Sequence, residues 1–255
     1  MQKSAFSLVE LAIVLVILGL LTGGILAGRA LIYASELRSV STDLIKYKTA
    51  ATAFRDKYLA LPGDMPNATS FWGIAAGNGQ DEDCRVAIAA GTETCNGNGN
   101  GRINRGGGPE RGEYYRFWQH LSNAGLLEGK YTGATSDPSA SFADVPGTNI
   151  PLTKFQNIAI ALRGDNYVSS LTHANRFLLS RCCHGSGYIE VRAFIPGDAY
   201  NLDTKMDDGI PGSGKFQSWG PGGYWSGCAT GSGGNSEYEL STNNRMCNLF
   251  YDLGL

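Results

Sequence analysis

A chain of 255 residues is long enough to bury a hydrophobic core, and one domain on a long helix fits this length best. Its 21 Lys and Arg residues nearly balance 23 Asp and Glu residues, and both kinds are scattered, so the basic stripe that nucleic-acid binding requires is missing. The 35 glycines and the charged fraction of only 17% predict a loop-rich fold that suits a secreted protein.

The segment from Phe6 to Ala27 is apolar apart from Glu10 and a few small hydroxyl residues. As a helix, at about 1.5 Å per residue, it would measure roughly 33 Å, close to the ~30 Å hydrocarbon thickness of a bilayer. The segment is longer than the apolar part of an ordinary secretory signal, and no small-residue cleavage site follows it. We therefore expect it to span a membrane and to be retained.

Glu10 is the charged residue inside this segment. A carboxylate in a spanning helix costs roughly 2.5 to 3.5 kcal/mol, so its presence indicates a function. The alternative is that Glu10 lies at the membrane surface, near a helix N-terminus whose dipole favours negative charge. Glu10 taken alone does not decide between these two interpretations.

The whole N-terminal pattern is more specific: a short leader with one lysine, then Phe-Ser-Leu-Val-Glu at 6–10, then the apolar run. It closely resembles the class III signal of type IV prepilins and secretion-system pseudopilins. The resemblance implies that a prepilin peptidase cuts between Ala5 and Phe6, that Phe6 becomes N-methylated, and that Glu10 acts in assembly as mature residue five. Two positions depart from the family: Ala5 stands where Gly is usual, and Ala27 stands near the place of a helix-kinking Pro.

Residues 29–61 contain neither Gly nor Pro, and their apolar residues recur at alternating spacings of four and three. This pattern predicts an amphipathic continuation of the helix, ended by Pro62 and Gly63. A free coiled coil is the alternative, but the same pattern serves a helix packed against its own sheet, as in pilins. The predicted apolar stripe consists of Tyr33, Leu37, Val40, Leu44, Tyr47, Ala51, Phe54 and Tyr58.

The remaining chain, residues 62–255, is predicted to form a globular head. After Gly- and Asn-rich loops, a second helix is expected at about 113–124. Strands of a meandering antiparallel sheet are expected at 158–162, 176–180 and 188–195, followed by loops from Pro196 and a short closing segment near Leu249. The predicted class is α+β, divided into a leader at 1–5, a membrane and filament-core helix at 6–28, its amphipathic continuation at 29–61, and the head.

All six cysteines follow the N-terminal helix, and an even count on an exported part favours disulfides. A zinc site is the alternative, but no pair has the C-x-x-C spacing. Because adjacent cysteines rarely bridge each other, Cys182 and Cys183 are each expected to bond to one of Cys228 and Cys247, in an order left open. The third hypothetical bridge joins Cys84 to Cys95.

Calcium is the cofactor for which the sequence offers ligands, at two places. Residues 96–101 copy the start of an EF-hand, but position twelve lacks its Glu; a group of acids precedes the Gly-Pro turn at 209–212. Both places equally fit Asx turns in solvated loops. The candidate ligands are Asp81, Asp83, Asn96, Asn98 and Asn100 at the first place and Asp203, Asp207 and Asp208 at the second.

No catalytic framework is visible in the sequence. Residues 209–215 match most of a P-loop, but Phe216 stands where Ser or Thr must hold magnesium, so we interpret them as a turn. The histidines at 120, 173 and 184 have no hydrolase or metalloprotease motif beside them. We therefore expect no enzymatic activity.

The resemblance implies a structural subunit of a type IV pilus-like filament. Its expected partners are the lipid bilayer, other pilins or copies of itself, a prepilin peptidase and methyltransferase, and an inner-membrane assembly platform. It would lie in the inner membrane first and in a surface filament afterwards. The alternatives are a pseudopilin of a type II secretion system and a minor tip pilin that binds a surface through an aromatic patch at Trp219, Tyr224 and Trp225.

Overall fold

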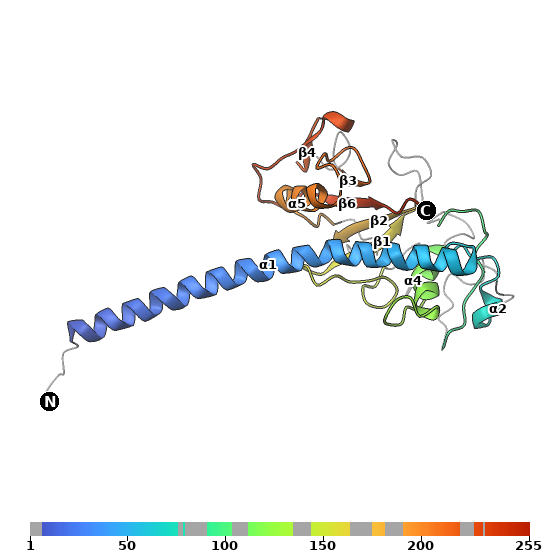
Figure 1. Cartoon of the computed structure of the whole chain (residues 1–255), viewed down its shortest axis with the longest axis horizontal. Helices are drawn as coiled ribbons and strands as arrows, with labels where there is room; N and C mark the ends of the chain where they lie inside the picture. The colour runs from blue at the N-terminus through green and yellow to red at the C-terminus, as the bar shows by residue number, and fades with distance from the viewer. Residues whose placement is uncertain are drawn as a thin grey trace.

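The computed structural model describes residues 7–75, 79, 91–103, 112–134, 144–163, 175–181, 191–219, 227–231 and 233–255. A long N-terminal helix is followed by a head that contains a four-stranded antiparallel sheet, which confirms the α+β class (Figure 1). The described elements are α1 (Leu8–Tyr58), α2 (Thr69–Trp72), α4 (Glu113–Asn123), β1 (Ile158–Arg163), β2 (Arg176–Arg181), α5 (Pro196–Met206), β3 (Phe216–Trp219), β4 (Ala229–Thr230), a 3-10 turn (Gly233–Asn235), β5 (Glu237–Tyr238) and β6 (Asn248–Asp252).

Helix α1 is one uninterrupted helix of 51 residues, about 76 Å long at 1.5 Å per residue. Ser7 caps its start, and Leu59, with φ at 54°, ends it in a left-handed conformation three residues before Pro62. The N-terminal half of α1 projects from the head, and the C-terminal half lies along it (Figure 1). The predicted continuation of the apolar helix as an amphipathic one is therefore confirmed.

The C-terminal half of α1 supplies one side of the core. Its buried residues are Leu37, Val40, Ser41, Leu44, Tyr47, Ala50, Ala51 and Phe54. Tyr47 packs edge-on against Trp118 of α4 and Phe177 of β2, with ring centroids 5.2 and 6.1 Å apart. The predicted stripe therefore packs against the chain's own head, and its two end members, Tyr33 and Tyr58, are the less buried ones.

The sheet has the strand order β1-β2-β6-β3, with every neighbouring pair antiparallel. The predicted strands at 158–162 and 176–180 are confirmed as β1 and β2, and the predicted closing segment as β6. Within the described part of the expected strand at 188–195 there are only isolated bridges, from Val191 to Arg181 and from Phe194 to Cys247. Helix α4 confirms the second predicted helix.

The expectation of loops directly after Pro196 is wrong, because α5 occupies Pro196–Met206. Pro196 stands in the first turn, where its missing N–H costs nothing, and Asp198 and Lys205 complement the helix dipole at the two ends. Ala199 and Leu202, three residues apart, bury one face of α5. This helix lies beside α1 at the point where α1 enters the head (Figure 1).

Candidate functional site

The most unusual surface of the molecule is the first half of α1, residues 8–32, which we call the projecting segment. Its large apolar side chains are exposed on every side of the helix, and Leu8, for example, is 84% exposed. At its glycines 19, 23, 24 and 28, a Cβ would meet no described atom within 4 Å apart from the nearby backbone of α1 itself. The segment is long and apolar enough to cross a membrane, and the described residues of the head leave its apolar window fully unburied.

Two polar side chains lie between Leu8 and Gly28. The Thr22 hydroxyl donates within the helix to the carbonyl oxygens of Leu18 and Gly19, at 2.9 and 3.1 Å. Such a bond satisfies the hydroxyl in an apolar environment without a second helix. The carboxylate of Glu10 is thus the one polar group between Leu8 and Gly28 that carries a charge.

Glu10 forms a capping box with Ser7. Its Oε2 atom accepts the backbone N–H of Ser7 at 2.9 Å, and the Ser7 hydroxyl oxygen accepts the N–H of Val9 at 3.3 Å. Both bonds satisfy donors that a helix start leaves free. These two bonds support the interpretation of Glu10 as a residue that begins the helix. A chain that begins at Phe6 would keep both bonds. Ala5 and Phe6 themselves lie outside the described residues.

The projecting segment meets the head at Tyr33. Its hydroxyl donates to a carboxylate oxygen of Asp198 on α5, and its ring packs edge-on against Phe155, with centroids 5.3 Å apart. Burial, followed by the contact with Asp198, raises the pKa of Tyr33, so the hydroxyl remains a donor. Sequence reasoning missed this contact because it placed Asp198 in a loop; the start signals of α5 could have revealed it.

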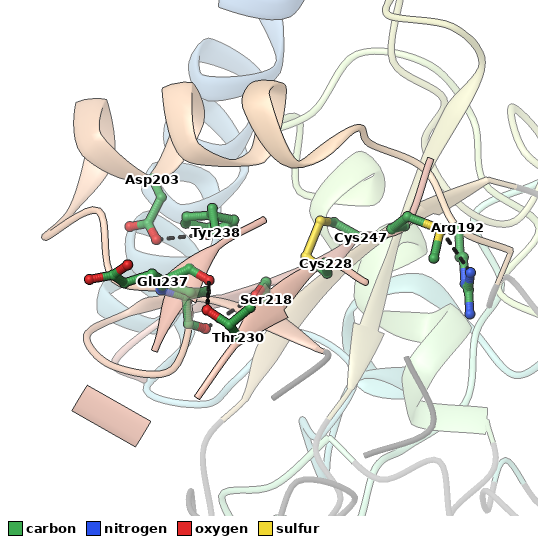
Figure 2. Close-up of a disulfide and its surroundings, with 10 residues drawn as sticks. Arg192, Asp203, Ser218, Cys228, Thr230, Glu237, Tyr238 and Cys247 are labelled. Atoms are coloured by element: carbon green, nitrogen blue, oxygen red, sulfur yellow. Dashed lines mark hydrogen bonds between the residues drawn. A yellow bond between two sulfur atoms is a disulfide. The ribbon is translucent and has the colours of Figure 1, made fainter. Parts of the chain in front are cut away.

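One expected disulfide pattern is wrong. Cys228 and Cys247 bond to each other, with Cα atoms 5.0 Å apart, so neither can bond to Cys182 or Cys183 (Figure 2). The β4–β5 hairpin turns the intervening chain back, which brings two cysteines 19 residues apart together. Cys95 is also disulfide-bonded, whereas Cys84, Cys182 and Cys183 lie outside the described residues, so the Cys84–Cys95 bridge stays a prediction.

Asp203, Asp207 and Asp208 converge at the C-terminal end of α5, with carboxylate oxygens within 4.8 Å of one another. The buried Asp203 accepts the hydroxyl of Tyr238 at 2.8 Å, drawn in Figure 2, and the N–H of Gly209 at 3.1 Å. Burial raises the pKa of Asp203 to about 6, against these two hydrogen bonds and with the help of the neighbouring acids. A calcium ion here stays a prediction.

Two of these acids accept hydrogen bonds from the turn at 209–215, which resembles a P-loop in sequence. Asp207 accepts the N–H groups of Lys215 and Phe216, and Asp208 accepts the N–H of Ile210 at 2.9 Å. Phe216 then begins β3, not the helix that a P-loop requires. Carboxylates therefore occupy the backbone N–H groups that a phosphate would need.

The asparagine run at 96–100 is built from Asx turns. The side-chain oxygen of Asn98 accepts the N–H of Asn100 at 3.0 Å, and that of Asn100 accepts the N–H of Arg102 at 2.8 Å. Asn96 instead accepts the N–H of Thr69 at 2.9 Å. Asp81 and Asp83 lie outside the described residues, so calcium at this place also stays a prediction.

His120 is a core residue. Its Nδ1 atom accepts the N–H of Gly63 at 2.9 Å, and its Nε2 atom lies 3.0 Å from the hydroxyl of Thr94. Burial, with a smaller effect of Arg116, lowers the pKa of His120 to about 3. The imidazole is therefore neutral and out of reach of a substrate. His173, His184, Tyr224 and Trp225 lie outside the described residues.

Comparisons with family models, with curated proteins and with solved structures found no match for this chain. Its function therefore has to be inferred from its own geometry. The projecting segment is the described surface with the clearest physical requirement: one helix that is apolar all round must be covered by lipid or by other helices. The candidate site is this segment together with Glu10 at its start and Tyr33 at its junction with the head.

Proposed function

We propose that this chain is the structural subunit of a type IV pilus-like extracellular filament, anchored and then polymerised through α1. The observation that carries the proposal is the division of one continuous helix into a fully exposed apolar half and a half that forms the core of the head. A rigid connection of this kind transmits the position of the projecting segment directly to the head. The proposal assigns no catalysis to the chain.

The proposal gives the projecting segment two successive environments. From Leu8 to Gly28 it is about 31 Å long, which matches the ~30 Å hydrocarbon layer of a bilayer. In a filament, the same residues would pack against the projecting segments of other copies, where glycines permit close approach of helices. The head would lie outside the bilayer in the first state and outside the helical core of the filament in the second, so it would reach the cell surface on assembly.

Processing connects these two states. Cleavage before Phe6, which the family resemblance implies, would leave a new amine four residues from Glu10. In a staggered stack this amine can meet the Glu10 carboxylate of a neighbouring copy, and an ion pair in an apolar setting stabilises only if both partners are present. A pseudopilin of a secretion system would use the same contacts, so the abundance and location of the filament separate these two roles.

The test is to express the chain together with a prepilin peptidase and the assembly platform of its host, shear the cells and analyse the released material by mass spectrometry. We expect abundant filaments made of a chain that begins with N-methylated Phe6. Cells without the peptidase serve as the control and should keep the full chain in the inner membrane. Processed protein that never leaves the membrane fraction, under any expression level, would contradict the filament role.

A further inference from the structure

A groove lies between α1 and α5 where the projecting segment enters the head. It has a volume of about 550 Å³ and is lined by Ala34, Leu37, Arg38, Asn201, Leu202 and Lys205. Leu37 and Leu202 are buried and make an apolar floor. Arg38 and Lys205 are both exposed and bring two cations to the same groove from elements more than 150 residues apart.

The two cations of the groove, Arg38 and Lys205, lie without an acidic partner among the described residues. Among the residues that the structure describes, neither Arg38 nor Lys205 forms an ion pair. Asp198, one turn before Leu202 on α5, already accepts a hydrogen bond from Tyr33, and the positive charge of Arg245 acts on it. Glu36 is two positions from Arg38 and so points to a different face of α1. Within the described part of the chain, the groove therefore carries two cations without an ion-pair partner, and the dipole of α5 favours one of them, Lys205.

The groove also lies at a definite depth. Ala34 follows the exposed apolar Ile32 by two residues. Along the helix axis, Arg38 lies roughly 9 Å beyond Ile32 and roughly 15 Å beyond Gly28, where the segment matched to the hydrocarbon layer ends. The polar headgroup layers add about 5 to 7 Å to each side of the hydrocarbon core, and long basic side chains reach back toward that layer. With the projecting segment in a bilayer, the groove faces the headgroups of the leaflet on the head side.

We propose that this groove binds the headgroup of an anionic phospholipid, with the phosphate between Arg38 and Lys205. The inference rests on the membrane stage of the proposed function. The subunit in the membrane would therefore prefer one class of lipid. Tyr33 and the bound lipid would together set the orientation of the head. The lipid must dissociate from the groove before the subunit leaves the membrane.

The test uses the full chain in a non-ionic detergent and native mass spectrometry with equal amounts of dioleoyl phosphatidylglycerol and dioleoyl phosphatidylcholine. Since each cation near an anionic headgroup contributes about 1 kcal/mol, we expect a preference for phosphatidylglycerol on the order of ten-fold. The double variant Arg38→Gln, Lys205→Gln should bind both lipids about equally. The double variant Arg55→Gln, Lys130→Gln removes the same charge from exposed positions elsewhere on the head and should keep the wild-type preference.

Three outcomes would overturn the inference: a preference that survives in Arg38→Gln, Lys205→Gln; a preference that the control variant also loses; and displacement of the lipid by millimolar inorganic phosphate, which would assign the groove to a soluble anion. Carbonate extraction of membranes separates the proposals. Wild-type chain that resists extraction but shows no lipid preference overturns this inference alone. Wild-type chain that is extracted overturns the membrane stage and this inference together.

Discussion

At the scale of single residues, Glu10 has a local role in the structure and an intermolecular role in the proposed filament. Its carboxylate accepts the N–H of Ser7 and so begins α1. A glutamine can make the same bond, because its amide oxygen is an equally placed acceptor. The two roles can therefore be separated by substitution, which the sequence alone did not suggest.

We predict that Glu10→Gln and Glu10→Ala both insert and are processed normally, and that both yield little or no filament. Glu10→Gln keeps the capping box but leaves the amine of a neighbouring copy without its anion, a loss of about 3 to 5 kcal/mol for a pair in an apolar setting. Quantification of sheared filaments measures the effect. If only Glu10→Ala lost filaments, helix capping and not charge pairing would be the function of Glu10.

His120 makes the stability of the head depend on pH. Its pKa is about 3 in the folded chain, below the ordinary value of 6.5, so the unfolded chain binds the proton more readily. The stabilisation is fully present above pH 6.5 and is lost progressively as the pH falls toward 3. Asp203, whose pKa is raised to about 6, acts in the opposite sense, because its stabilisation is present below about pH 3.8 and is lost as the pH rises through 6.

We predict that His120→Gln is less stable than wild type at pH 7 but loses less free energy of unfolding between pH 7 and pH 5. Glutamine can accept the N–H of Gly63 and does not titrate. Urea unfolding in a non-ionic detergent, followed by tryptophan fluorescence at both pH values, provides the comparison. An unchanged pH dependence in the variant would show that His120 does not control it.

At the scale of elements, α1 changes its surroundings within one helix. Leu44 is fully buried, whereas the next residue, Ile45, is 55% exposed. The two side chains are isomers of the same size in one helix, so their main difference is burial. They provide a matched pair for testing where the head rests on α1.

We predict that Leu44→Ala lowers the free energy of unfolding of the head by about 2 to 5 kcal/mol, because it leaves a cavity in the core. Ile45→Ala, as a surface substitution, should change it by about 0.5 kcal/mol or less. Urea titration of both variants supplies the measurement. Equal losses would mean that α1 packs on the head through another face.

The disulfide between Cys228 and Cys247 closes the loop that contains the β4–β5 hairpin. We predict that a non-reducing peptide map contains this bridge, and that Cys228→Ala with Cys247→Ala destabilises the head by about 3 kcal/mol, as expected for a loop of this length. The hydrogen bond that Tyr238 of this hairpin donates to Asp203 of α5 should weaken with it. A map that links either cysteine to Cys182 or Cys183 would contradict the bridge.

At the scale of the whole molecule, the long axis runs from the exposed apolar end of α1 to the head, and α1 connects the two without a break (Figure 1). We predict that mature protein begins at Phe6, N-methylated, because the retained apolar segment follows a short leader with a single lysine. Mass spectrometry of the N-terminal peptide decides this. A peptide that begins at Met1, or one that begins after Gly28, would count against processing at this site.

Features that depend on neighbours along the chain could be predicted from the order of the amino acids. The long apolar run, the apolar stripe from Leu37 to Phe54 and helix α4 follow from hydrophobic periodicity, which is a local signal. The strands β1 and β2 were found for the same reason. Helix α5 was missed because the Gly and Asp residues around its start and end resemble those of a loop, and its short buried face becomes recognisable only against α1.

The contacts between residues that are distant along the chain became visible only in the folded protein. The partner of Cys228 depends on the path of a hairpin, and six cysteines allow many pairings with equal local plausibility. The contact of Tyr33 with Asp198 and the groove between Arg38 and Lys205 join residues of α1 to residues of α5. No local pattern encodes such contacts, because they arise when separate apolar faces are buried against each other and carry their polar neighbours with them.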